Sequence, residues 1–100
     1  MHIPDYRPLT PGEILQAEFV EPLQLTQGDL AEMLGISRQR INEIIKGVRE
    51  VTADSAIRLG KLFGVSPQFW LMCQLRFDLW QALHAKAAAD YEDIRPIHQK

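Results

Sequence analysis

Cysteines, long apolar runs and repeats are scarce or missing in this sequence of 100 residues. The single Cys73 cannot form a disulfide within the chain. No apolar run approaches the roughly 18 residues that a membrane-spanning helix needs, and no secretory signal is present. We therefore expect a cytoplasmic protein that does not enter a membrane. Low-complexity tracts and internal repeats are also absent.

Side-chain groupings that bind metals or perform catalysis are lacking as well. The histidines His2, His84 and His98 have no paired spacing that would make a ligand set with Cys73. There is no glycine-rich phosphate loop and no GxSxG motif. The acidic residues at 90–93 have no pocket motif beside them and are typical of a solvated tail. We expect no enzyme activity, no metal site and no cofactor.

A sustained alternation of apolar and polar residues, which would predict strands, occurs nowhere in the chain. The length suits one domain with a modest core. The composition, 46% hydrophobic and 24% charged, is that of a globular protein. The sequence therefore predicts a single all-α domain over residues 1–100.

Helix starts and stops are what the sequence does contain. Residues 10–13 (Thr-Pro-Gly-Glu) form a capping box with proline at the first helical position. The helix that follows is predicted to run to about Val20, because Pro22 prevents it from continuing. Residues 1–9 and 91–100 are predicted to be irregular or loosely attached.

Two further helices are predicted in the second half of the chain. Thr52 is an N-cap, and the helix it starts is predicted to end at Gly64. Ser66 followed by Pro67 is another helix start, and the last helix is predicted over about residues 66–89.

The central segment, residues 26–47, predicts two short helices joined by a tight turn. Thr26 caps the first helix, Gly35 can take the left-handed conformation that ends it, Ser37 caps the second, and Gly47 ends that one. The inward apolar positions at helical spacing are Leu30, Ala31, Leu34, Ile41, Ile44 and Ile45. A turn this short is that of a helix-turn-helix, whose second helix enters the major groove of double-stranded DNA.

The outward face of that second helix carries the side chains that DNA reading requires. They are Arg38, Gln39, Arg40, Asn42, Glu43 and Lys46. Arginine can bond two atoms of guanine, and glutamine or asparagine two of adenine. The helix enters N-terminus first, which favours Arg38, Gln39 and Asn42 over Lys46 for base contacts; Arg40 can reach a base or a phosphate. An ordinary solvated face is the alternative, and the caps and turn favour DNA.

Charge is distributed unevenly along the chain, whose net charge is −2. Counting Lys and Arg against Asp and Glu, residues 1–36 carry −5, residues 37–50 carry +2 and residues 51–100 carry +1. The positive charge is therefore local to the proposed reading face. The acidic first third points equally to a basic protein partner and to side chains that merely keep the protein in solution.

The last predicted helix is apolar on too many sides for a simple surface helix. Its large apolar residues are Phe69, Trp70, Leu71, Met72, Leu75, Phe77, Leu79, Trp80 and Leu83. Such a helix must be buried on more than one side. One side can cap the other helices, and the remainder favours a second copy or another protein, unless the core uses it all. Aromatics are enriched at interfaces, so Trp70, Phe77 and Trp80 are the predicted anchors of a homodimer.

Together these segments resemble the HigA-type antitoxins, a branch of the Xre-like (lambda repressor-like) DNA-binding proteins. The resemblance covers about residues 8–79. It depends on PGEIL at 11–15, EFVEPLQLTQGDLAEMLGISRQRINEIIKG at 18–47, VTADSAIRLGKLFGVSPQFWLMCQ at 51–74 and RFDL at 76–79. The combination is more specific than the helix-turn-helix alone.

The resemblance implies five helices, pairing through the C-terminal region, repression of the protein's own operon and binding of a cognate, RelE-like toxin that cleaves mRNA. It implies that Gln27 meets a phosphate, and that Arg49 and Thr52 touch the DNA backbone. The residues predicted to bind the operator are Gln27, Ser37, Arg38, Gln39, Arg40, Asn42, Lys46, Arg49 and Thr52. The alternatives are a stand-alone repressor without a toxin, and an interaction module with a vestigial helix-turn-helix.

Overall fold

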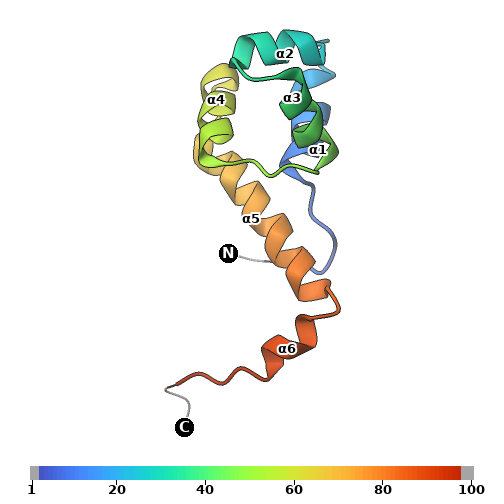
Figure 1. The fold of residues 1–100 in the computed structure, drawn as a ribbon, viewed down its shortest axis with the longest axis vertical. Coiled ribbons are helices and arrows are strands. Elements are labelled where there is room, and N and C mark those ends of the chain that lie inside the picture. Colours follow the sequence, from blue (N-terminus) through green and yellow to red (C-terminus); the bar gives the residue numbers. More distant parts are fainter. Residues whose placement is uncertain (1–2, 98–100) are drawn as a thin grey trace.

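The computed structural model describes residues 3–97, in which all regular secondary structure is helical and no strand occurs (Figure 1). The elements are α1 (Pro11–Leu15), the π-helical η1 (Gln16–Val20), α2 (Gln27–Leu34), α3 (Arg38–Lys46), α4 (Ala53–Phe63), α5 (Pro67–His84) and α6 (Ala88–Glu92). The prediction of an all-α chain is confirmed. His2 and His98, which were considered as metal ligands above, lie outside the described residues.

The first predicted helix has the expected extent but changes type halfway. Its capping box forms as predicted: the Thr10 hydroxyl accepts from the Glu13 N–H at 3.1 Å, and the Glu13 carboxylate accepts from the Thr10 N–H at 2.8 Å. After Leu15 the helix widens to a π turn, in which the Glu21 N–H bonds the Gln16 carbonyl at 3.0 Å. The sequence offered no signal for this widening.

The boundaries of the next helices follow the local signals in the sequence. Each N-cap hydroxyl accepts a bond from the N–H three residues later; the caps are Thr26, Ser37, Thr52 and Ser66. The residues that end α2, α3 and α4 in left-handed conformation are Gly35, Gly47 and Gly64, with φ of 70°, 77° and 71°. Short-range hydrogen bonds and backbone sterics therefore set these boundaries.

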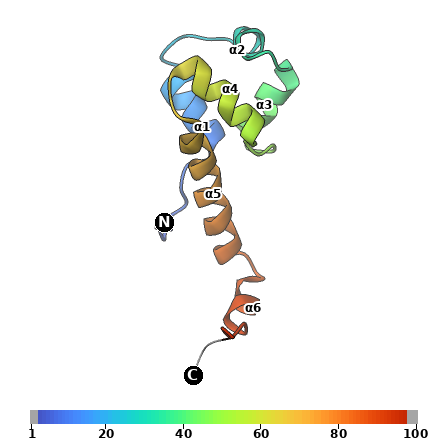
Figure 2. The same cartoon turned by 90° about the vertical axis from the view of Figure 1, so that its left-hand side faces the viewer.

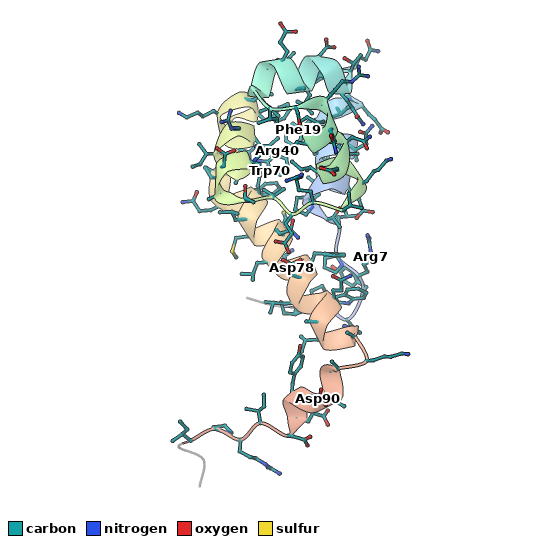
Figure 3. The ribbon with its side chains drawn as sticks, viewed as in Figure 1. Arg7, Phe19, Arg40, Trp70, Asp78 and Asp90 are labelled. Carbon is teal, nitrogen blue, oxygen red and sulfur yellow. The ribbon has the colours of Figure 1, made fainter. Side chains whose placement is uncertain are left out.

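Trp70, the fourth residue of α5, lies at the centre of the core. It is 0% exposed, and the centre of its ring lies 5.6 Å from that of Phe19 in η1 (Figure 3). The prediction that Trp70 anchors a dimer is therefore wrong, because the first turns of α5 pack against the chain's own helices. The indole N–H of Trp70 has no hydrogen-bond partner in the described part of the chain.

The last predicted helix ends earlier than expected, at His84 and not at residues 88–89. Ala85 adopts an extended conformation, with φ −79° and ψ 165°, and a separate short helix, α6, follows. Alanine favours helix locally, so no signal in the sequence predicts this break. The described chain thus has six α-helices, where five were predicted, and residues 91–92 are helical.

The N-terminal segment, residues 3–9, lacks regular structure as predicted but is not loosely attached. The Asp5 carbonyl accepts from the Trp80 indole N–H at 3.1 Å. The Arg7 guanidinium lies 5.2 Å from the centre of the Phe77 ring, a cation–π arrangement. This segment therefore covers two of the three aromatics that were predicted to join protomers.

The outer part of α5 leaves the helix cluster as a rod, with α6 beyond it (Figures 1 and 2). The radius of gyration is 16.4 Å, against about 13 Å for a compact domain of this length. The rod's outer leucine face, at exposed fractions of 37–50%, comprises Leu71, Met72, Leu75, Leu79 and Leu83. Across residues 3–97, we find no helix with the length and apolarity to cross a membrane.

Candidate nucleic-acid interface

α2 and α3 form the predicted helix-turn-helix, and the back of α3 is firmly anchored. Ile41 is 0% and Ile44 2% exposed, both in the common core. The opposite side of α3 is open, and Gln39 and Lys46 are exposed there, while Arg38 is exposed at the first turn of the helix. The fold therefore presents these three predicted DNA ligands to solvent on a fixed helix.

Two predicted DNA ligands from different helices contact each other. The Asn42 amide N–H of α3 donates to the Gln27 side-chain carbonyl at the start of α2, at 3.2 Å. Each amide retains one unshared end, a donor NH₂ on Gln27 and an acceptor oxygen on Asn42. A donor suits a phosphate oxygen, so this arrangement fits the phosphate contact predicted for Gln27.

Arg40 points toward α4 and not outward. Its guanidinium Nη2 lies 2.9 Å from Oδ2 of Asp54, and Figure 3 shows Arg40 between α3 and α4. Arg58 Nε contacts the same Asp54 oxygen at 3.0 Å, and Arg58 Nη1 donates to the Leu34 carbonyl at 2.8 Å. Bonds from Arg58 and then Arg40 hold the pKa of Asp54 below its ordinary value.

Sequence reasoning missed Asp54 and Arg58 as members of this site. Their spacing of four residues on a helix is a recognisable ion-pair signal. The link to Arg40 spans 14 residues, and no local pattern predicts such a contact.

The remaining predicted ligands are partly engaged within the protein. Arg49 Nη2 and Nε lie 2.8 Å and 2.9 Å from a Glu43 carboxylate oxygen, which holds Arg49 beside α3. The Ser37 hydroxyl accepts from the Arg40 N–H at 3.1 Å. The Thr52 hydroxyl caps α4 by accepting from the Ser55 N–H at 3.3 Å. Because this hydroxyl is already engaged, a phosphate at Thr52 would contact the backbone N–H groups at the N-terminus of α4.

Within residues 3–97, no group of three or more His, Cys, Asp or Glu side chains is arranged to hold a metal ion. Cys73 is half-buried, and burial raises the pKa of its thiol. A raised pKa leaves a thiol protonated and poorly nucleophilic, so nothing at this position marks a reactive cysteine.

Comparison with known sequences places the chain among helix-turn-helix proteins. The profile of the family described as Helix-turn-helix matches residues 17–70. An HTH-type transcriptional regulator of Haemophilus influenzae is 42% identical over 80 residues, which are 80% of this chain and 75% of that protein. Antitoxin HigA-1 of Vibrio cholerae is 42% identical over 74 residues, 74% of this chain and 70% of the relative.

A solved structure extends the similarity to nearly the whole fold. The antitoxin HigA of Pseudomonas aeruginosa, determined with the higBA promoter, superposes with a TM-score of 0.84 at 37% sequence identity. The superposition covers 91% of this chain and 99% of that one. The similarity therefore includes the helix-turn-helix and α5 together.

Proposed function

The chain belongs to the helix-turn-helix family and to its branch of HigA antitoxins, and from this premise we propose that it is a homodimeric, sequence-specific DNA-binding antitoxin. In this function it represses its own operon and neutralises a cognate RelE-like toxin that cleaves mRNA. The observation that carries the proposal is the open face of α3, anchored by Ile41 and Ile44. A relative with the same fold was determined with promoter DNA.

We assign the reading of operator bases to the leading turns of α3. Arg38 and Gln39 are exposed there, and Asn42 is oriented by Gln27. Each well-placed bidentate contact gives roughly 1–3 kcal/mol of discrimination between bases. We assign phosphate contacts, which orient the protein on the duplex, to Gln27, Ser37, Lys46, Arg49 and Thr52.

Dimerisation uses the outer leucine face of α5 in this proposal. Leu75 and Leu79 are 44% and 40% exposed, an unusual state for a row of leucines along one helix. The rod is covered by residues 3–9 only on the side of Phe77 and Trp80, which leaves the outer leucine face open. Two-fold pairing would present two reading helices to half-sites about 34 Å apart, one turn of DNA.

Toxin binding is proposed for the acidic side chains on and just after η1. A ribonuclease must hold a polyanion, so its working surface should be basic, and opposite charges speed and orient association. Glu18 and Glu21 are exposed along η1 and just after it. Glu13 is excluded from this role, since it caps Thr10 and pairs with Arg7. The acidic residues 90–93 on and after α6 are a second candidate surface.

Because its proposed ligand is the operon's own DNA, we place the protein in the bacterial cytoplasm, and we assign it no catalytic role. A stand-alone repressor remains the alternative within the class. A vestigial helix-turn-helix in an interaction module is the alternative outside it.

Expression of the complete operon tests these alternatives directly. The tagged protein should co-purify with a small basic protein, and should shift a duplex from its own promoter in a salt-dependent manner. Promoter binding without a co-purified protein would favour the stand-alone repressor. Absence of any salt-dependent DNA binding would refute the reading face and favour the interaction module.

The surface proposed for the toxin has its own test. Glu18→Lys combined with Glu21→Lys should slow toxin association at low salt, while reversal of the charges at residues 90–93 tests the second surface. Both surfaces would be refuted if each variant associated at the wild-type rate.

A further inference from the structure

Asp54 joins the three helices around the reading face. It is the second residue of α4, and its Oδ2 accepts from Arg40 of α3 at 2.9 Å and from Arg58 of α4 at 3.0 Å. Arg58 in turn donates to the carbonyl of Leu34, the last residue of α2, at 2.8 Å. Asp54 is thus the shared acceptor of a bridge that links α2, α3 and α4.

Arg40 occupies the flank of α3, not its open side. Residues on an α-helix are about 100° apart, so Arg40 is turned away from Gln39 toward α4. Its side chain is 26% exposed, while that of Asp54 is 54% exposed. The Arg40 side chain is therefore partly covered, although in the sequence Arg40 lies between Gln39 and Asn42, which are both proposed to contact DNA.

We propose that Asp54 is a positioning residue that holds Arg40 against α4 and off the DNA backbone, and thereby sets the sequence specificity of binding. The proposal rests on the DNA-binding function above. It reassigns Arg40, which the sequence indicated as a DNA ligand, to a brace between α3 and α4.

Loss of this ion pair would have two consequences, and both would lower the sequence specificity of binding. A freed Arg40 would add a cation for phosphates, and phosphate contacts strengthen binding to any duplex. The same release would loosen α3 against α4 and so weaken base contacts, which need fixed geometry. Asp54 therefore keeps sequence-independent binding low while it keeps the reading helix in place.

The test is a double-mutant cycle on Asp54 and Arg40. Asp54→Asn keeps the shape of the side chain and removes its charge, and Arg40→Ala removes the cation. Both single variants and the double variant are titrated with a duplex from the protein's own promoter and with a scrambled duplex of equal length. Titrations are repeated from about 50 to 200 mM salt, because the slope of log affinity against log salt counts phosphate contacts.

Asp54→Asn should steepen the slope by about 0.9, the value for one added phosphate contact. This corresponds to a roughly 3.5-fold larger loss of affinity over that salt range. The gain on the scrambled duplex should exceed the gain on the promoter duplex and should disappear in the double variant. Arg40→Ala alone should leave the slope unchanged.

A matched control separates the ion pair from a simple change of charge. Glu50→Gln removes a carboxylate from the loop before α4, and Glu50 forms no ion pair in the part of the chain that is described. Its effect on affinity should be the same with or without Arg40. Circular dichroism and thermal melting establish that each variant is folded.

Two results would overturn the proposal. A flattening of the slope by about 0.9 in Arg40→Ala alone would mean that Arg40 binds phosphate despite Asp54. A gain in Asp54→Asn that persisted in the double variant would mean that lost repulsion between the carboxylate and DNA alone explains it. A wild-type protein that binds neither duplex would refute the proposed function itself, whereas wild-type binding with no Arg40-dependent gain would refute only the role of Asp54.

Discussion

Replacing Gly12 with alanine tests how α1 holds the reading helix. Gly12 is buried in α1, and a Cβ added there would overlap the carbonyl oxygen of Ile44 and lie 2.8 Å from that of Ile45. Both atoms belong to the backbone of α3. A backbone cannot rotate away as a side chain can, so either α1 or α3 must move.

The expected loss in the free energy of unfolding is at the upper end of the range for overpacking, about 3 kcal/mol. For a domain of this size, each kcal/mol lowers Tm by roughly 4–8 °C, so Gly12→Ala should lower Tm by about 12–24 °C. Thermal unfolding followed by circular dichroism measures this. One fixed protein concentration is needed, because the melting of a dimer depends on concentration.

Gly28→Ala is the matched control, because it makes the same substitution in α2 with open space around it. The nearest atom to its added Cβ is the Thr26 hydroxyl oxygen at 3.7 Å, an ordinary contact. Alanine restricts the unfolded chain and favours helix, so this variant should gain about 0.5 kcal/mol. If Gly12→Ala melted within about 2 °C of the wild type, the close packing of α1 on α3 would be refuted.

Three other predictions address DNA, assembly and pH. Gln39→Ala should weaken promoter binding by about 1–3 kcal/mol more than binding to unrelated DNA, whereas Lys46→Ala should weaken both equally. If Gln39→Ala lost equal affinity for the two DNAs in gel shifts, base reading by Gln39 would be excluded. Leu75→Glu should lower the dimer fraction in sedimentation, and an unchanged dimer would exclude the outer leucine face as the interface. The Thr10 N–H and Arg7 hold the pKa of Glu13 below its ordinary 4.5, so the stability it adds is present above that pH and lost as pH falls through the lowered pKa. Glu13→Gln should therefore make the decline of Tm from about pH 5 to 3 shallower, and an unaltered decline would contradict the capping role.

The helix boundaries that frame the candidate interface could be predicted because their determinants are local. Thr26, Gly35 and Ser37 act on backbone groups within three or four residues, so a short window of sequence contains both partners of each bond. The outward placement of Gln39 and Lys46 follows from the helical period once the isoleucines of α3 face inward. By contrast, the pairing of Arg40 with Asp54 joins separate helices, and periodicity alone does not place one helix against another.

The sequence by itself determined the starts of α1 to α5, the ends of α2 to α4, the turn between α2 and α3, and the excess of apolar surface on α5, because each depends on neighbours along the chain. Only the tertiary structure decided which apolar side of α5 is used where. Trp70 faces the core and Leu75 faces solvent, while residues 3–9 cover Phe77 and Trp80. The physical reason is that burial is a property of packed neighbours: a helix that is apolar on several sides contains no information about which of them another element will cover.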